Sequence, residues 1–397
     1  MKIFLNKYLI ISLFCLSSVS SSGVGTWTYK GIFGGGDCDV TYSFSINNKG
    51  YVGAGRTSAS TYKSDMWEYD PVSNIWIQKA SFPGGDRGSV VSFVLNNKAY
   101  AGMGFNGSVY SKDLWEYDPF TNQWAAKANF PGPARYSCIA FALNGMGYIG
   151  TGFNGSILSD FYQYNPATDS WIQKASFPGI PRQAANCFAV NNMGYLTGGF
   201  NSGISFNDLW QYQPLNDLWV QKASFPAAGR RGISTFVINQ MAYAGLGYDN
   251  SIYYTDFWKY DPTVNAWTSE TGFGGVERYL AFAFEIGSTA YVGTGSRGNV
   301  SSPVFISDFW EFDSNTTSTN EIKSDILNVW YNGLCINING IMPNEIDYAL
   351  IDLSGKIVNQ GKVESNSIPF STLYKGVFLL KLYNNNSLSQ VFKFQNL

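Results

Sequence analysis

The sequence predicts an all-β protein: a six-bladed β-propeller closed by an N-terminal strand and followed by a small β-sandwich. Three motifs carry this prediction because they recur in step, about 48 residues apart, through residues 24–318. The composition agrees with a folded, strand-rich chain, since 17% of the residues are aromatic, 14% are charged and the formal net charge is −2. Such a chain is neither disordered nor a polybasic nucleic-acid binder.

Residues 1–22 have the pattern of a secretory signal peptide. Lys2 and Lys7 precede a short apolar stretch, YLIISLFCL (8–16), and serines and Gly23 follow it. A membrane anchor is the alternative, but nine apolar residues are too short to span roughly 30 Å of hydrocarbon. We therefore expect export of a mature protein with a propeller over residues 23–319 and a sandwich over 320–397.

The repeat is defined by three motifs in a constant order. The first is DMWEYDPVSNIW (65–76), which returns as DLWEYDPFTNQW (113–124), DFYQYNPATDSW (160–171), DLWQYQPLNDLW (208–219), DFWKYDPTVNAW (256–267) and a shortened DFWEFD (308–313). The second is a tyrosine followed by G-x-G, as in YAGMG (100–104), and the third is F-P-G-x-x-R, as in FPGPAR (130–135). Each period holds four short runs rich in aromatic and β-branched residues, which is the pattern of a four-stranded propeller blade.

The last copy of the first motif lacks its closing tryptophan. Trp27, in the segment that precedes the first repeat, matches the closing tryptophan of the other copies. We therefore expect the N-terminal segment to supply the outer strand of the sixth blade, which would close the ring and remove its exposed edges.

With these motifs the chain resembles the Kelch-repeat proteins over residues 24–318. The Kelch double glycine is intact only at Gly198-Gly199, whereas the second glycine of the pair is present in all six copies. The resemblance implies a propeller whose ligand mouth lies on the face of the inter-blade loops.

The period stops near Asn320. The runs IDLSGKIV (351–358), LYKGVFLLKLY (373–383) and VFKF (391–394) resemble the C-terminal sorting domain of type IX secretion, a β-sandwich. The opening Asn-Pro of that family is absent, and Lys323-Ser324-Asp325 stands there instead. The resemblance implies passage through the outer membrane by the type IX machinery, with the protein then released or held on the cell surface. An ordinary accessory β-sandwich is the alternative.

All eight arginines map to one face of the predicted propeller. Five occupy one position of the inter-blade loop, and the others lie beside Arg230 or in the loops between strands 2 and 3; they are Arg87, Arg135, Arg182, Arg230 and Arg278, then Arg231, Arg56 and Arg297. Arginine suits carboxylates and stacks on aromatic rings. The resemblance implies that the five line the ligand mouth, but repetition also suits a structural role in which each arginine pins a blade.

Aromatic–Asn pairs in the same loops are further candidates for ligand contact: Phe105-Asn106, Phe153-Asn154 and Phe200-Asn201. Packing between blades is their alternative role. The aspartate before strand 3 recurs six times, yet each stands alone without the clustered oxygen ligands of a calcium site, so a structural cap is the better interpretation. The apolar stretches around Cys138 and Cys187 favour buried free thiols over a bridge.

The chain contains no histidine, which excludes histidine-dependent triads, histidine-ligated zinc or copper and hence a copper radical oxidase. We therefore expect no cofactor and no metal, and a binding module for a glycan or an acidic peptide. A sugar-acting enzyme of the sialic-acid mutarotase kind stays open, with Asp86 and Glu277 as its candidate carboxylates. A purely structural adhesion protein is the third possibility.

Overall fold

The computed structural model describes residues 25–299 and 302–314 of the propeller region and, further along, 328–331, 335–339, 346–352, 356–362, 367–369, 376–384 and 387–396. The chain separates into two compact units, Met1–Thr317 and Ser318–Leu397. The expected signal peptide lies outside the described residues. No helix in the described part is long and apolar enough to cross a membrane.

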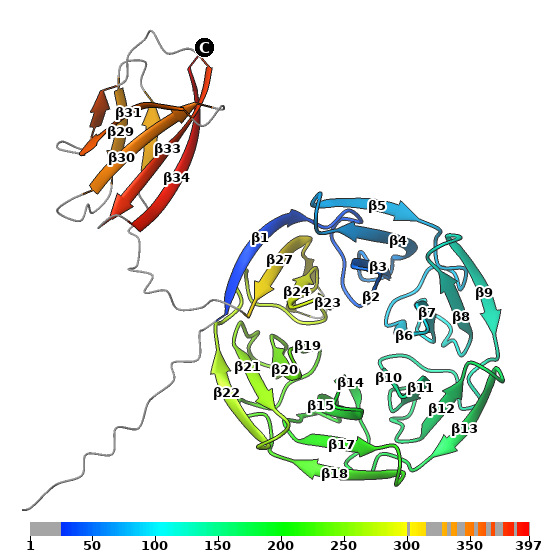
Figure 1. The fold of residues 1–397 in the computed structure, drawn as a ribbon. Helices are drawn as coiled ribbons and strands as arrows, with labels where there is room; N and C mark the ends of the chain where they lie inside the picture. Colours follow the sequence, from blue (N-terminus) through cyan, green and yellow to red (C-terminus); the bar gives the residue numbers. More distant parts are fainter. Residues whose placement is uncertain are drawn as a thin grey trace, which may run out of the picture. The chain divides into compact units, whose positions relative to one another are not determined.

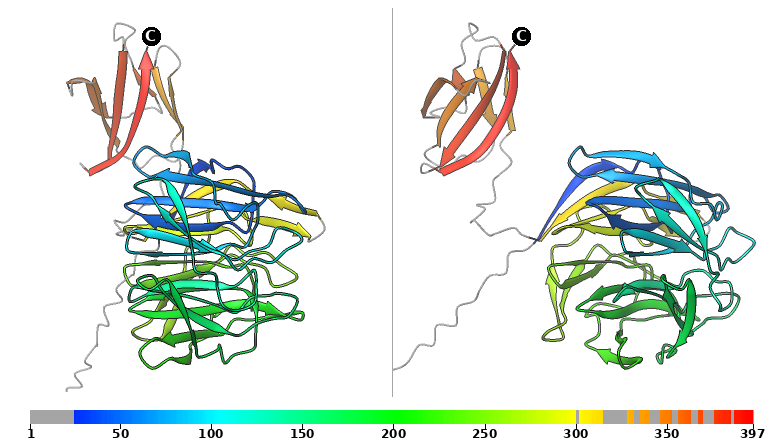
Figure 2. Two further views of the ribbon diagram at one scale, coloured as in Figure 1. Left: turned by 90° about the vertical axis from the view of Figure 1, so that its right-hand side faces the viewer. Right: turned by 45° about the vertical axis from the view of Figure 1, so that its right-hand side comes forward.

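Six antiparallel sheets form a ring around one axis (Figure 1). Seen edge-on, their strands run between two faces of the ring that carry the loops (Figure 2). The first blade contains β2 (Tyr42–Ile46), β3 (Lys49–Arg56), β4 (Tyr62–Asp70) and β5 (Ile75–Lys79). The second contains β6 (Val91–Leu95), β7 (Lys98–Gly102), β8 (Leu114–Asp118) and β9 (Gln123–Lys127). The third contains β10 (Ile139–Leu143), β11 (Met146–Gly150), β12 (Phe161–Asn165) and β13 (Ser170–Lys174). The next two are β14 (Gln183–Val190), β15 (Met193–Asn201), β17 (Leu209–Gln213) and β18 (Leu218–Lys222), with β16 (Ile204–Ser205) beside β15; and β19 (Ser234–Ile238), β20 (Met241–Gly245), β21 (Phe257–Asp261) and β22 (Ala266–Glu270).

The sixth blade joins the two ends of the propeller. Its inner strands are β23 (Phe282–Ile286), β24 (Thr289–Gly293) and β27 (Asp308–Asp313), and its outer strand is β1 (Thr26–Ile32), in blue beside the yellow of β27 in Figure 1. Trp27 pairs with Phe312 across β1 and β27, and its Nε1 donates to the carbonyl of Thr271 at 3.2 Å. The predicted closure by the N-terminal segment is therefore confirmed. A hairpin of β25 (Ser296–Asn299) and β26 (Ser302–Phe305) fills the longer loop of this blade.

The turn between strands 3 and 4 ties each blade to the one before it. In the second blade Asn122 has φ +56°, and its Oδ1 accepts from the Tyr117 hydroxyl at 2.9 Å and from the Ala80 amide at 3.0 Å. Trp124 Nε1 donates to the Ala80 carbonyl at 3.0 Å. The tyrosine, the turn residue and the tryptophan of the repeated motif thus act as one inter-blade joint.

The second glycine of each G-x-G pair has a conformational reason to persist. These glycines have φ between +95° and +120°, and each donates its amide to the loop that enters the next blade, as Gly104 does to the Arg135 carbonyl at 2.9 Å. The residue before each one has φ between +55° and +69°, a left-handed region that Met103 and Thr151 adopt at some cost. This difference explains why only the second glycine is invariant within the chain.

Close packing between blades depends on small residues in the second strands. A Cβ atom on Gly147 would lie 2.3 Å from the ring of Phe93 in the preceding blade, and one on Gly194 would lie 2.3 Å from Phe141. Stacked inner rings, such as Phe93 and Tyr100 at 5.3 Å, complete the apolar layer between neighbouring sheets.

The second unit contains two antiparallel sheets. One has β28 (Asn328–Tyr331), β29 (Cys335–Asn339) and β32 (Ser367–Pro369); the other has β31 (Ile357–Lys362), β30 (Ile346–Asp352), β33 (Gly376–Asn384) and β34 (Ser387–Asn396). Leu350, Ile368 and Leu380 are fully buried, so side chains from both sheets contribute to its core. This arrangement agrees with the predicted small β-sandwich.

Candidate functional site

A cup of about 230 Å³ opens on the face that carries the inter-blade loops and the loops between strands 2 and 3. We call it the mouth cup. Its wall and floor are formed by Val40, Arg56, Tyr62, Gly88, Ser89, Phe105, Tyr136, Ser137, Gln183, Ala184, Phe200, Arg231, Tyr279 and Leu280. Aromatic rings and two arginines therefore surround a single depression on the propeller axis.

Short bridges between two kinds of loop build the wall of the mouth cup. The residue after each inter-blade arginine pairs with the residue after the second glycine, as Gly88 does with Phe105 and Tyr136 with Phe153. The repeat thereby places one variable position at the same height in every blade, and it holds Asp39, Gly88, Tyr136, Gln183, Arg231 and Tyr279. Phe105 and Tyr136 have ring centroids 5.3 Å apart and form an aromatic wall near the second and third blades.

The floor of the cup is a ring of six residues that we call the axial belt: Val40, Ser89, Ser137, Ala184, Gly232 and Leu280. All six have φ between +49° and +60°. Their amides donate to the carbonyl of the neighbouring belt residue at 2.8–3.3 Å in five of the six steps. Five of the six belt residues line both the cup and the channel beneath it, so the belt marks the boundary between the two.

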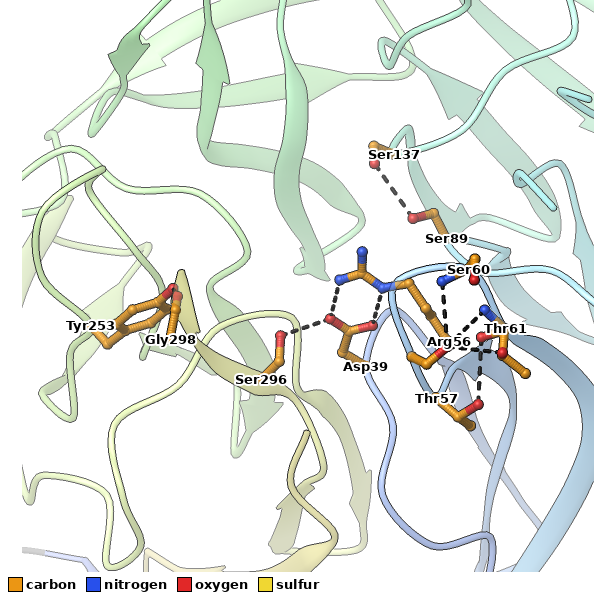
Figure 3. Close-up of polar contacts among 11 residues, drawn as sticks. Asp39, Arg56, Thr57, Ser60, Thr61, Ser89, Ser137, Tyr253, Ser296 and Gly298 are labelled. Carbon is orange, nitrogen blue, oxygen red and sulfur yellow. Dashed lines mark hydrogen bonds and ion pairs between the residues drawn. The ribbon is translucent and has the colours of Figure 1, made fainter. Parts of the chain in front are cut away.

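The belt is interrupted between Ser89 and Ser137. Among the described residues the Ser137 amide has no hydrogen-bond partner, and the two hydroxyls lie 3.5 Å apart at the gap. Figure 3 shows both serines near Arg56. The break leaves polar groups that a ligand entering the cup can reach.

Arg56 is oriented by a buried carboxylate. Its Nε and Nη2 donate to Asp39 at 3.0 and 2.6 Å, and Ser296 from the sixth blade donates to the same carboxylate at 2.7 Å (Figure 3). Burial opposes the charge on Arg56, but the hydrogen bonds and the charge of Asp39 outweigh it and raise its pKa. The remaining nitrogen, Nη1, has no partner among the described residues and points away from Asp39.

Arg231 is the second cation of the cup. Its guanidinium lies 4.2 Å from the ring centroid of Phe200 and 5.4 Å from that of Tyr248, and it is half-buried. In the described part of the chain it forms no ion pair and no side-chain hydrogen bond. Since Asp39 neutralises Arg56, the cup carries a net positive charge from Arg231.

Five arginines occupy the same position of the inter-blade loop, which we call the register position: Arg87, Arg135, Arg182, Arg230 and Arg278. None of these register arginines lines the cup. Arg135 is fully buried, and it donates to Asp160 through both terminal nitrogens at 2.6 Å and to the Thr151 carbonyl at 2.9 Å. The same pairs recur as Arg87–Asp113, Arg182–Asp208, Arg230–Asp256 and Arg278–Asp308. The expectation of ligand contact is corrected for these residues, because their donors are used in pinning each loop to its own blade.

The first blade lacks this arginine and uses a lysine instead. Cys38 stands in its place, and Lys63 reaches in to donate to the Gly35 carbonyl at 2.8 Å and to approach Asp65 at 3.6 Å. Lys63 Nζ lies 5.1 Å from the Phe33 ring, as the register arginines lie over the phenylalanine of their own loops. The six aspartates are thus structural acceptors, each of them except Asp160 also accepting from a tryptophan two residues on.

The remaining predicted site residues divide between the cup and the loops around it. Phe105 and Phe200 line the cup with Arg56. Arg297 lies outside the lining, where it pairs with Glu277 at 3.0 Å. The three asparagines also lie outside the lining: Asn106 and Asn154 accept from amides of their own loops, and Asn201 donates to the Pro181 carbonyl. Phe153 packs on Tyr136 at 5.8 Å and also lies outside the lining.

The two carboxylates nominated for catalysis also lie outside the lining of the cup. Asp86 accepts from the Ser64 hydroxyl at 2.6 Å, and Glu277 pairs with Arg297. The Cys138 and Cys187 thiols are free, and burial raises the pKa of each to about 12.

Several lining residues escaped the sequence argument: Tyr62, Ser89, Tyr136, Ser137, Gln183, Arg231 and Tyr279. Six of them, all except Tyr62, follow the register position by one or two residues, so the register position indicates where they lie. The register position is marked by an arginine in five of the six blades. The cup is built instead from the residues that follow this position, and these vary from blade to blade.

The comparisons agree with this architecture. The family described as the KLHDC2/KLHL20/DRC7 Kelch-repeats domain matches residues 36–181, which span the first three blades and support the Kelch resemblance. A solved structure titled "Structure of YjhT" matches with a TM-score of 0.58 and 15% identity over 69% of this chain and 94% of that one. No curated protein sequence matches. The propeller fold is therefore shared, and the residues of the cup must be judged from this chain.

Proposed function

We propose that the protein is an exported binding protein whose mouth cup holds a ring-sized group carrying one carboxylate, such as a terminal acidic sugar of a glycan. The observation that carries this proposal is Arg231, which lies over the rings of Phe200 and Tyr248 and forms no ion pair with any residue that the structure describes. An acid group would gain a charge-assisted hydrogen bond there, and sugar faces stack on aromatic rings.

Arg56 and the belt gap support the same ligand class. Nη1 of Arg56 and the hydroxyls of Ser89 and Ser137 offer donors at the floor, and Tyr62, Phe105 and Tyr136 offer an apolar wall. One net positive charge suits a ligand with one acid group better than a polyacid. An acidic side chain of a peptide is the alternative occupant.

The test uses the full chain and pairs of glycans that differ by one acid group, sialylated against desialylated and glucuronic-acid-ended against glucose-ended. We expect the acidic member to bind at least tenfold more tightly, and Arg231→Gln to remove that preference. Arg297→Gln is the matched control, because this arginine lies on the same face but outside the cup.

Failure of the acidic glycans to bind, or unchanged binding by Arg231→Gln, would overturn the proposal. Binding of acidic peptides instead of glycans would identify the acidic side chain of a peptide, the alternative occupant, as the ligand of the cup. Proton NMR of free sialic acids incubated with the protein would reveal the sugar-acting enzyme, since accelerated exchange between anomers is its signature.

We further propose export by the signal peptide and then by the type IX machinery through residues 320–397. The motifs in the C-terminal segment support this route, as does its small β-sandwich. In a cell with that machinery, deletion of residues 320–397 should retain the protein in the periplasm. Equal amounts outside the cell with and without the segment would contradict the route.

A further inference from the structure

The channel below the axial belt is a separate compartment. It is lined by alternate residues of the six innermost strands, and its lower part, a cavity of about 320 Å³, opens on the face opposite the mouth cup. We call this part the lower channel. The axial belt lies between the lower channel and the cup, and the two linings have no residue in common.

One residue of the lower channel differs in charge from the residues at the same position of the other inner strands. The last channel-facing position of each inner strand holds an uncharged side chain in five blades and a glutamate in the sixth: Ser45, Val94, Ala142, Ala189, Val237 and Glu285. Glu285 is the single charged residue among those that line the lower channel.

The Glu285 carboxylate has neither an ion pair nor a side-chain hydrogen bond in the described part of the chain. The side chain is exposed to water inside the channel, and the strands of the channel wall lie around it. Beside it, on the adjacent inner strand, Ser45 has a buried hydroxyl that lacks a hydrogen-bond partner. The two strands are joined one position higher, where Ser43 donates to the Ala283 carbonyl at 2.7 Å.

At the height of Glu285 the wall across the channel is apolar, whereas the next ring of the lining also holds Ser92, Cys187 and Thr235. Val94, Ala142, Ala189 and Val237 complete the ring, and no lysine or arginine belongs to the lining. Lys49 and Lys98, which begin the second strands of the first two blades, pair with Asp70 and Glu116 on the third strands. An uncompensated carboxylate that faces an apolar wall favours a cation with an apolar body.

We propose that the lower channel binds a small organic cation, a primary ammonium on a short alkyl chain, with Glu285 as its counter-ion. The ammonium would donate to the Glu285 carboxylate and to the Ser45 hydroxyl, and the alkyl chain would lie against Val94, Ala142 and Val237. The inference stands independently of the function proposed for the cup.

The probe is n-butylammonium chloride, titrated into the full chain by calorimetry in phosphate buffer. We expect saturable binding at pH 8 that Glu285→Gln weakens at least tenfold. Glu285→Val, which copies the residue at Val94 and Val237, should abolish it. Glu277→Gln is the control, because it removes an exposed carboxylate on the opposite face.

The pH dependence provides a second readout. Loss of solvation in the channel disfavours the charged form and raises the pKa of Glu285 to about 7, and burial raises the pKa of Cys187, the other titratable group in the lining, to about 12, so this thiol stays neutral. Lowering the pH from 8 to 5.5 should therefore weaken binding roughly thirtyfold. Absence of binding at pH 8, or binding that neither variant nor pH changes, would overturn the proposal.

Discussion

At the scale of the residue, the register arginines show how one side chain can both pair with a carboxylate and pack against an aromatic ring. Arg135 is enclosed by its bidentate aspartate, a carbonyl and the ring of Phe130 at 4.6 Å. An arginine so used is fully buried and donates four hydrogen bonds within the protein, so it does not reach a ligand in the cup. The free donors of the mouth face belong to Arg231 and to Nη1 of Arg56, which sit at positions where the blades differ.

Replacement of Arg135 by alanine tests this structural role. The change leaves Asp160 without its partner in the blade interior, so the free energy of unfolding should fall by about 3 kcal/mol. Chemical denaturation measures it, and Asp160→Ala in the same chain should recover part of the loss. A loss below the error of the measurement would contradict the pinning role.

Two neighbouring glycines with similar φ permit a matched comparison, one at the end of a G-x-G pair and one in the loop that follows it. Gly152 has φ +95°, and a Cβ there would lie 2.7 Å from the Tyr136 carbonyl oxygen; Gly155 has φ +102° with nothing within 4 Å. Gly155→Ala should cost about 1 kcal/mol from backbone strain alone, and Gly152→Ala clearly more because the clash adds to it. Equal thermal shifts for both variants would show that the close approach is unimportant.

At the scale of the element, β1 decides whether the ring is closed. Trp27 packs within 4.9 Å of Phe273 and Phe312 and so joins the fifth and sixth blades. It belongs to a segment almost 300 residues away in sequence from its partners on β27. The cost of ordering the intervening chain is recovered only when all six blades are in place.

Trp27→Ala should therefore weaken the propeller as a whole. We expect a loss of about 3 kcal/mol and a single unfolding transition at a lower temperature, because a cavity opens at the closing joint. Trp124→Ala, at the same joint between the first and second blades, is the comparison. A separate early transition in the Trp27 variant alone would indicate that the sixth blade unfolds independently.

At the scale of the whole molecule, the six strands of the inner ring create an environment that no single blade contains. Glu285 is a surface residue of its own sheet, but the other five inner strands enclose it. Its pKa rises to about 7 because the channel disfavours its charge. Folding must therefore depend on pH through this group.

The direction of the pKa shift of Glu285 determines whether folding stability rises or falls with pH. The folded protein retains this proton to higher pH than the unfolded chain, so Glu285 opposes folding increasingly as the pH rises from about 4.5 to about 7. Because channel water screens the carboxylate, we expect an effect of about 1 kcal/mol. Glu285→Gln should unfold like the unaltered protein at pH 4 and be more stable at pH 8, in buffers without amines. A pH-independent difference would contradict the shift.

Much of the architecture was predictable because it is local and repeated. Strand spacing, the turn of the Tyr-Asp-Pro motif and the closing tryptophans each depend on a few neighbouring residues, and six copies make the pattern visible. The ligand-facing residues were predictable only in part. Arg56, Phe105 and Phe200 were identified as ligand contacts, and Arg231 was placed on the same face. Tyr136 and the serines of the axial belt were not identified, because the residue type at their positions changes from blade to blade.

By itself the sequence determined the number of blades, the closure by β1 and the face on which the arginines gather, since these follow from motif order and strand direction. Only the tertiary structure decided which arginines are available to a ligand and where an unpaired charge remains. Those properties depend on distances among residues from different blades, and such distances exist only after the ring has closed around its axis.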